Sequence, residues 1–162
     1  MPERSGPGPS RAPRTLLAFD FGRRRIGVAA GEDGVGTAGA LPALRGDAPG
    51  PDWAAIAALV EEWRPQLILV GKPLSLDGTT TWMTGLATAF ARELGRRFGV
   101  PVEMIEEALT TRDARAQLAE QRRQGARRRR VQRGEVDSAA ARIILESWIE
   151  RHAAAQRRTR LG

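Results

Sequence analysis

The sequence of 162 residues contains no cysteine, and its only histidine is His152 near the C-terminal end. These two absences exclude thiol nucleophiles, disulfide bonds and the zinc sites that are built from cysteine and histidine. Any bound metal ion must therefore be held by oxygen atoms. No segment approaches the roughly 18 apolar residues of a membrane span, and residues 1–14 lack the apolar centre of a signal peptide. We therefore expect a cytoplasmic protein that does not bind a membrane.

Lysine is nearly absent as well, because Lys72 is the only lysine among 26 basic residues. Arginine therefore carries almost all of the positive charge, which gives a net charge of +7 and an isoelectric point near 11.4. The guanidinium group pairs with two phosphate oxygens at once, and a basic domain of this kind is typical of nucleic-acid binding. Coding from a G+C-rich genome produces the same composition, so the charge alone leaves both explanations open.

The length predicts a single domain with one core. Residues 1–14 have the composition of a disordered tail, residues 15–151 are expected to form the domain, and residues 152–162 are expected to form a basic, frayed tail. Residues 121–134 contain seven arginines and almost nothing to bury. We expect this segment to be a mobile basic loop within the domain.

The apolar pattern predicts an α/β domain. Short apolar runs predict strands at 15–20, 26–30, 35–41, 67–70 and 100–105. Helical spacing predicts helices at 52–63, 83–98 and 136–151, with a short helix from Thr110 to Leu118. Short connections favour an antiparallel arrangement of the first three strands, and crossover helices favour parallel pairing of the last two. A mixed five-stranded sheet of this layout, flanked by helices, is that of the RNase H-like fold.

Acidic residues follow two of the predicted strands. Asp20 ends the first apolar strand, and Glu106 and Glu107 follow the last one. Ligands collect outside the carboxyl ends of strands in open α/β sheets, so these acids are candidates for a site. Asp20 is also consistent with an ordinary turn before Gly22, and either glutamate with a solvated surface charge.

A third acid, Asp137, shares one face of the last predicted helix with Ala141, Ile144 and Trp148. A carboxylate on a buried face must be paired or must bind something, although Asp137 is also suited to capping the helix. If the sheet brings Asp20, Asp137 and one of the two glutamates together, their oxygens would suit Mg²⁺ or Mn²⁺. Two such ions support phosphodiester hydrolysis.

The segment GKPLSLDGT at 71–79 follows the predicted central strand. Lys72, Ser75 and Thr79 could grip a phosphate there, although the segment is also consistent with a plain turn-rich loop. Its order of glycine, lysine and hydroxyl residues is not that of a P-loop.

Four segments together resemble the successive motifs of the YqgF (RuvX-like) family: DFGRRRIGVA at 20–29, GKPLSLDGT at 71–79, EALTT at 107–111 and VDSAAA at 136–141. The resemblance spans about Leu16 to Ile149. It implies an RNase H-like fold and a nuclease that either matures the 5′ end of pre-16S ribosomal RNA or resolves Holliday junctions. It further implies that Asp20, Glu107 and Asp137 are the catalytic, metal-binding acids.

The third motif departs from the family pattern, because Glu106 replaces an aspartate and Ala108 replaces an arginine. Ser75 and Leu76 also replace the usual Asn-Met pair, so the role of that loop is less defined. We expect contacts to nucleic acid from basic and hydroxyl residues of the motifs and of the arginine-rich loop, namely Arg23, Arg24, Arg25, Lys72, Ser75, Thr79, Thr110, Arg127, Arg128, Arg129 and Arg130.

Three other functions are alternatives to RNA cleavage. An actin-like ATPase or sugar kinase would close two domains over its nucleotide, and the chain is long enough for only one. A non-catalytic ribosome assembly factor would bind RNA but would tolerate loss of the three acids. A DNA junction resolvase would need a symmetric homodimer, to which Trp53 or Trp82, both expected to be exposed, could contribute. We favour pre-ribosomal RNA as the substrate on the family resemblance.

Overall fold

The computed structural model describes residues 13–22, 24–34, 37–47, 50–72, 82–106 and 133–161, with the backbone alone at 37, 133–137 and 157–161. The predicted tail up to residue 12, the predicted helix from Thr110 to Leu118 and most of the predicted basic loop lie outside these residues. Along the chain the elements are β1 (Thr15–Asp20), β2 (Arg25–Glu32), β3 (Thr37–Arg45), α1 (Trp53–Trp63), β4 (Leu67–Lys72), α2 (Trp82–Phe98), β5 (Val102–Glu106) and α4 (Arg133–Leu161).

The strands form one five-stranded sheet in the order β3-β2-β1-β4-β5. β1 pairs antiparallel with β2 and β2 antiparallel with β3, whereas β1, β4 and β5 run parallel. This arrangement confirms the predicted mixed sheet. The third strand begins at Thr37 and ends at Arg45, a few residues later than the pattern predicted.

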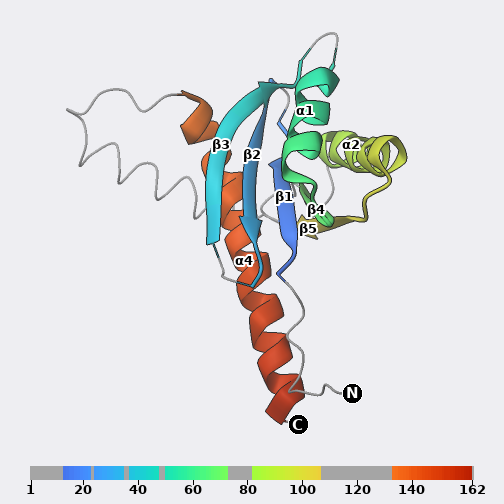
Figure 1. Cartoon of the computed structure of the whole chain (residues 1–162). Helices are drawn as coiled ribbons and strands as arrows, with labels where there is room; N and C mark the ends of the chain where they lie inside the picture. The colour runs from blue at the N-terminus through green and yellow to red at the C-terminus, as the bar shows by residue number, and fades with distance from the viewer. Residues whose placement is uncertain are drawn as a thin grey trace, which may run out of the picture.

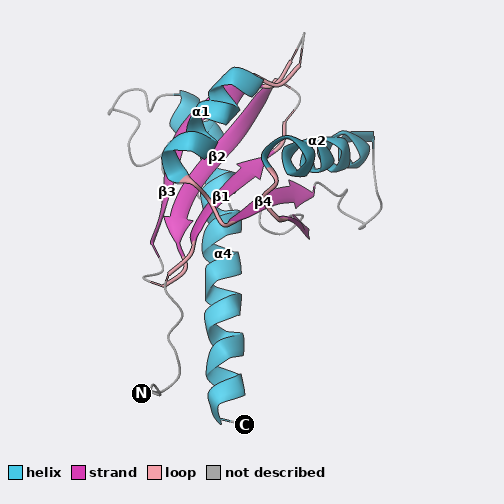
Figure 2. Ribbon diagram, turned by 45° about the vertical axis from the view of Figure 1, so that its right-hand side comes forward, coloured by secondary structure: helices cyan, strands magenta, loops and turns pink. Residues whose placement is uncertain are grey.

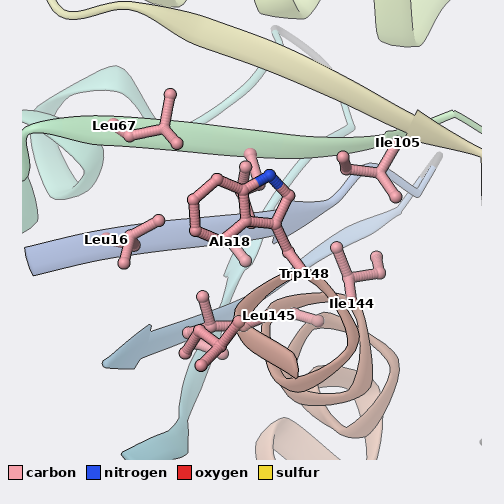
Figure 3. Close-up of a cluster of buried hydrophobic side chains, with 11 residues drawn as sticks. Leu16, Ala18, Leu67, Ile105, Ile144, Leu145 and Trp148 are labelled. Atoms are coloured by element: carbon pink, nitrogen blue, oxygen red, sulfur yellow. The ribbon is translucent and has the colours of Figure 1, made fainter. Parts of the chain in front are cut away.

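Helices cover both faces of the sheet, with α1 and α2 on one side and α4 on the other (Figure 1). Because neighbouring residues of a strand point to opposite faces, each strand contributes to both layers. Leu17 and Phe19 of β1 pack with Phe90 of α2, whereas Leu16 and Ala18 pack with α4. Figure 3 shows this second cluster, in which Leu16, Ala18, Leu67 and Ile105 meet the helix side chains Ile144, Leu145 and Trp148.

Helix α1 begins and ends as the sequence predicts. The Asp52 carboxylate accepts a hydrogen bond of 3.1 Å from the Ala55 N–H and so caps the first turn. Arg64 adopts the left-handed conformation at the other end, with Pro65 following. Trp53 is packed against Phe90 and Phe98, so the expectation that it is exposed is wrong. Trp82, at the start of α2, is 62% exposed.

Replacing Asp52 by alanine is expected to lower the free energy of unfolding by about 1 kcal/mol, because the Ala55 N–H loses its acceptor. The measurement is urea unfolding of the wild type and of Asp52→Ala. Asp47→Ala, at an exposed position in the preceding loop, is the matched control and should lie within about 0.5 kcal/mol of the wild type. Equal losses in the two variants would exclude the cap.

Helix α4 is longer at both ends than the predicted 136–151, since it begins at Arg133 and ends at Leu161. Residues 152–161, expected to fray, are therefore helical. The chain here is rich in alanine and arginine, which favour helices, and His152 is held by Trp148 and Arg14 at the point where the helix leaves the sheet. Among the described residues, no helix, α4 included, is both long enough and apolar enough to cross a membrane.

Candidate functional site

Asp20 is the last residue of β1 and is half-buried. It belongs to the sheet rather than to the turn that follows, because it pairs with Gly27 of β2 on one side and Gly71 of β4 on the other. Alternation along β1 assigns Asp20 to the same face as Leu16 and Ala18, which is the face that α4 covers. Its carboxylate is thus directed to the layer between sheet and helix at the end of the sheet.

Glycine occupies both positions beside Asp20 in the sheet, and cross-strand neighbours point to the same face. Gly27 and Gly71 therefore place no side chain next to the carboxylate, and both are buried. A β-bulge between β2 and β3 lies at the same point, between Ile26 and Val28. Glycines of this kind allow close approach of a ligand to the backbone, and bulges often lie beside active sites.

The beginning of α4 is fixed to this bulge by Ser138. The Ser138 hydroxyl accepts a hydrogen bond of 2.9 Å from the Val28 N–H and donates one of 2.5 Å to the Leu41 carbonyl. Val28 is the neighbour of Gly27, so this contact brings the start of the helix to the strand position next to Asp20. Asp137 directly precedes Ser138 in α4. Residues 110 positions apart in the chain are thereby brought together.

The same geometry excludes one explanation of Asp137. The helix begins at Arg133, one turn before Asp137, so this residue is not an N-cap. Ala141, Ile144 and Trp148, which share its helical face, are buried against the sheet as the sequence predicts. The backbone of Asp137 lies at the end of that buried face, and its side chain is outside the described part of the structure.

Sequence reasoning did not identify Ser138. Replacing it by alanine is expected to lower the free energy of unfolding by about 1–3 kcal/mol, because a buried N–H and a partly buried carbonyl each lose their partner. The measurement is urea unfolding, and Ser147→Ala on the same helix is the control, expected within about 0.5 kcal/mol of the wild type. An unchanged unfolding midpoint in Ser138→Ala would show that the hydroxyl does not hold the helix.

The alternation of β5 divides its residues between the two faces of the sheet. Ile105 packs towards α4, and Glu103 on the same face accepts a hydrogen bond of 2.7 Å from the Trp148 indole N–H. Glu106, the last residue of β5, is exposed and belongs to the opposite face. Glu107 lies outside the described residues.

Of the residues expected to bind nucleic acid, three are described. Arg24 and Arg25 are exposed at the start of β2, and Arg25 pairs with the exposed Arg45 of β3. Arg25 is in phase with Gly27 and so shares the face of Asp20. Lys72 ends β4 at the same edge of the sheet, but alternation assigns it to the opposite face. The others lie outside the described residues, namely Arg23, Ser75, Thr79, Thr110, Arg127, Arg128, Arg129 and Arg130.

Within the described part of the chain, no three side chains of histidine, aspartate or glutamate gather into a metal-binding group. Two of the predicted ligands, Glu107 and the Asp137 side chain, lie outside that part. The described part of the site therefore consists of the Asp20 carboxylate, the two glycines beside it and the start of α4. A carboxylate oxygen is the type of ligand that a hard divalent ion prefers.

Comparison with known proteins gives a family match over residues 14–151 to RuvX, described as Holliday junction resolvase. The chain is 48% identical over 137 residues to the "Putative pre-16S rRNA nuclease" of Pectobacterium atrosepticum, covering 85% of this chain and 96% of that protein. It is 46% identical over 142 residues to the protein of the same name from Yersinia pestis, covering 88% of this chain and 99% of that one.

Solved structures of similar fold include Thermus thermophilus RuvC in complex with a Holliday junction substrate, with a TM-score of 0.53 and 15% identity over 87% of this chain and 96% of that one. The yeast mitochondrial resolvase Ydc2 matches with a TM-score of 0.51 and 13% identity, over 85% of this chain and 78% of that one. Similarity at this level shows the fold alone, and it confirms the predicted RNase H-like architecture.

Proposed function

The chain belongs to the RuvX family, and from this premise we propose that it is a metal-dependent nuclease that hydrolyses phosphodiester bonds at the Asp20 end of the sheet. Asp20, Glu107 and Asp137 are the proposed ligands of Mg²⁺ or Mn²⁺. The observation that supports the proposal best is the Ser138 contact, which brings the start of α4 to the strand position beside Asp20.

Each proposed ligand contributes oxygen atoms, the donor type that Mg²⁺ and Mn²⁺ prefer. When bound, the ions would supply an activated water and would stabilise the charge on the leaving oxygen. The protein supplies the positions of the ligands: β1 fixes Asp20, and Ser138 fixes the turn of α4 that contains Asp137. Gly27 and Gly71 add no side chain beside Asp20, where the phosphate of the scissile bond is proposed to bind.

The alternation of side chains along β5 supports Glu107 as the third proposed ligand. Ile105 lies on the α4 face and Glu106 on the other, so one more residue of the same alternation would return Glu107 to the face of Asp20. We therefore assign the metal-binding role to Glu107 and not to Glu106. Arg25, exposed on that same face, is proposed to contact a phosphate of the bound strand, as is the arginine-rich segment that contains Arg127–Arg130.

The proposed substrate is the 5′ leader of pre-16S ribosomal RNA, on the names of the relatives, and such a role implies a cytoplasmic location. A four-way DNA junction is the second candidate, favoured by the description of the family. Junction resolution would need a homodimer, because two strands are cut symmetrically.

The two substrates are ranked by incubating the protein with each, labelled at the 5′ end, in Mg²⁺ or Mn²⁺. We expect cleavage of the RNA at a lower protein concentration than the junction. Preferential cutting of the junction by a dimeric form of the protein, measured by gel electrophoresis and light scattering, would instead assign it to recombination.

A further inference from the structure

Helix α4 continues past the residues that match the family. The match ends at residue 151, whereas the helix ends at Leu161. Figures 1 and 2 show that the C-terminal turns of α4 project beyond the end of the sheet, away from the elements that cover it. The other end of the same helix carries Asp137. One continuous helix therefore joins the proposed site to a segment that the family match does not include.

Specific contacts hold the helix where it leaves the sheet. The His152 ring stacks on Trp148, with 4.6 Å between ring centroids and 12° between planes. Arg14 lies against both residues, with its guanidinium 3.2 Å from His152 Nε2 and 5.4 Å from the Trp148 ring centroid. Asp33 in the turn after β2 anchors Arg14 through an ion pair of 3.0 Å. These contacts fix the direction in which the following turns extend.

The projecting segment has a charge of one sign. Residues 151–162 contain four arginines, Arg151, Arg157, Arg158 and Arg160, and no aspartate or glutamate. The described residues after Arg151 include three alanines and Gln156, which provide no apolar stripe wide enough for a protein core. A cationic helix without an apolar face suits a polyanion rather than a protein groove.

We propose that residues 151–161 form an arm that binds the phosphate backbone of a duplex flanking the cleavage site. The proposal rests on the proposed function, because both require that the substrate is a nucleic acid. Arg157 lies twenty residues after Asp137, which corresponds to about 30 Å along a helix. That length spans about nine base pairs of B-form DNA at 3.4 Å each, and somewhat more of an A-form RNA duplex, in which the rise per base pair is smaller. The arm therefore selects substrates in which a double-stranded segment of at least that length adjoins the cut.

The arm is tested by binding measurements in the Asp20→Asn background, where cleavage does not interfere. The full-length triple variant Arg157→Ala, Arg158→Ala and Arg160→Ala keeps the helix, because alanine is the strongest helix former. Its matched control removes three exposed arginines from the opposite layer, Arg64→Ala, Arg92→Ala and Arg96→Ala. Both variants lose the same net charge, so a difference between their binding affinities results from the position of the arginines that were removed.

Affinity is measured for duplexes of increasing length that adjoin one single-stranded end, at several salt concentrations. The expected result is that the arm variant binds the longer duplexes about tenfold more weakly and that its logarithmic salt slope falls by about two to three. The parent and the control should gain affinity once the duplex exceeds about nine base pairs, whereas the arm variant should not.

Equal binding by the arm variant and the control, at every length, would overturn the arm while leaving the nuclease proposal untouched. Failure of every protein, the parent included, to bind any nucleic acid would instead overturn the proposed function and the arm with it.

Discussion

Replacing Asp20 by asparagine is expected to reduce the cleavage rate by at least about a hundredfold without unfolding the protein. A metal ion supplies several kcal/mol of transition-state stabilisation, and about 1.4 kcal/mol corresponds to a factor of ten in rate. Asparagine has nearly the same shape as aspartate but lacks the negative charge that holds the ion. The half-buried position at the end of β1 should accept it, because neighbouring Gly27 and Gly71 have no side chains to rearrange.

The measurement for Asp20→Asn is the single-turnover rate of RNA cleavage, together with the thermal unfolding midpoint. The matched control is Glu32→Gln, which removes a carboxylate from the opposite end of the same hairpin, where Glu32 pairs with Thr15. This control should cleave RNA at the wild-type rate. Cleavage by Asp20→Asn at a rate equal to that of Glu32→Gln would remove Asp20 from the reaction.

The second large effect distinguishes the adjacent glutamates. Glu107→Gln is expected to lower the cleavage rate by at least about a hundredfold, for the same reason as Asp20→Asn. Glu106→Gln is expected to leave it nearly unchanged, because Glu106 is exposed on the face of β5 that is opposite to α4. The two substitutions remove the same group from neighbouring positions, so each controls for the other. A larger loss in Glu106→Gln would show that the chain does not continue the alternation of β5 beyond Glu106.

Most of the sheet and its helices could be predicted because apolar periodicity is a local property of the chain. The continuous apolar run at 67–70 predicts a strand buried on both faces, and Ile68 and Leu69 are fully buried in opposite layers. The stripe of Ala141, Ile144 and Trp148 predicts the face of α4 that meets the sheet.

The features that local patterns missed all depend on contacts distant in sequence. Ser138 forms its hydrogen bonds at the bulge in the pairing of β2 with β3. The spacing of residues in the helix does not reveal this bulge. Where α4 leaves the sheet, His152 is held by Arg14, a contact between residues 138 positions apart. Trp53 is covered because α2 places Phe90 and Phe98 against it.

The candidate site was predicted in part. The sequence identified Asp20, but its pairing with Gly27 and Gly71 follows only from the register of the strands. The alternative that Asp137 caps its helix could not be excluded from the sequence, because nothing local marks a start at Arg133. The metal-binding role of Glu107 remains a prediction, which the alternation of side chains along β5 supports.

The most direct test of the proposed nuclease is the cleavage of labelled pre-16S leader RNA as Mg²⁺ or Mn²⁺ is added back to chelator-treated protein. RNA binding by the wild type and by Asp20→Asn is followed in parallel. We expect no cleavage without metal, a saturable rise in rate as metal is added to the wild type, and binding without cleavage in Asp20→Asn. If the RNA stays intact at every metal concentration while both proteins bind it equally, the acids are not catalytic and the protein is an RNA-binding assembly factor.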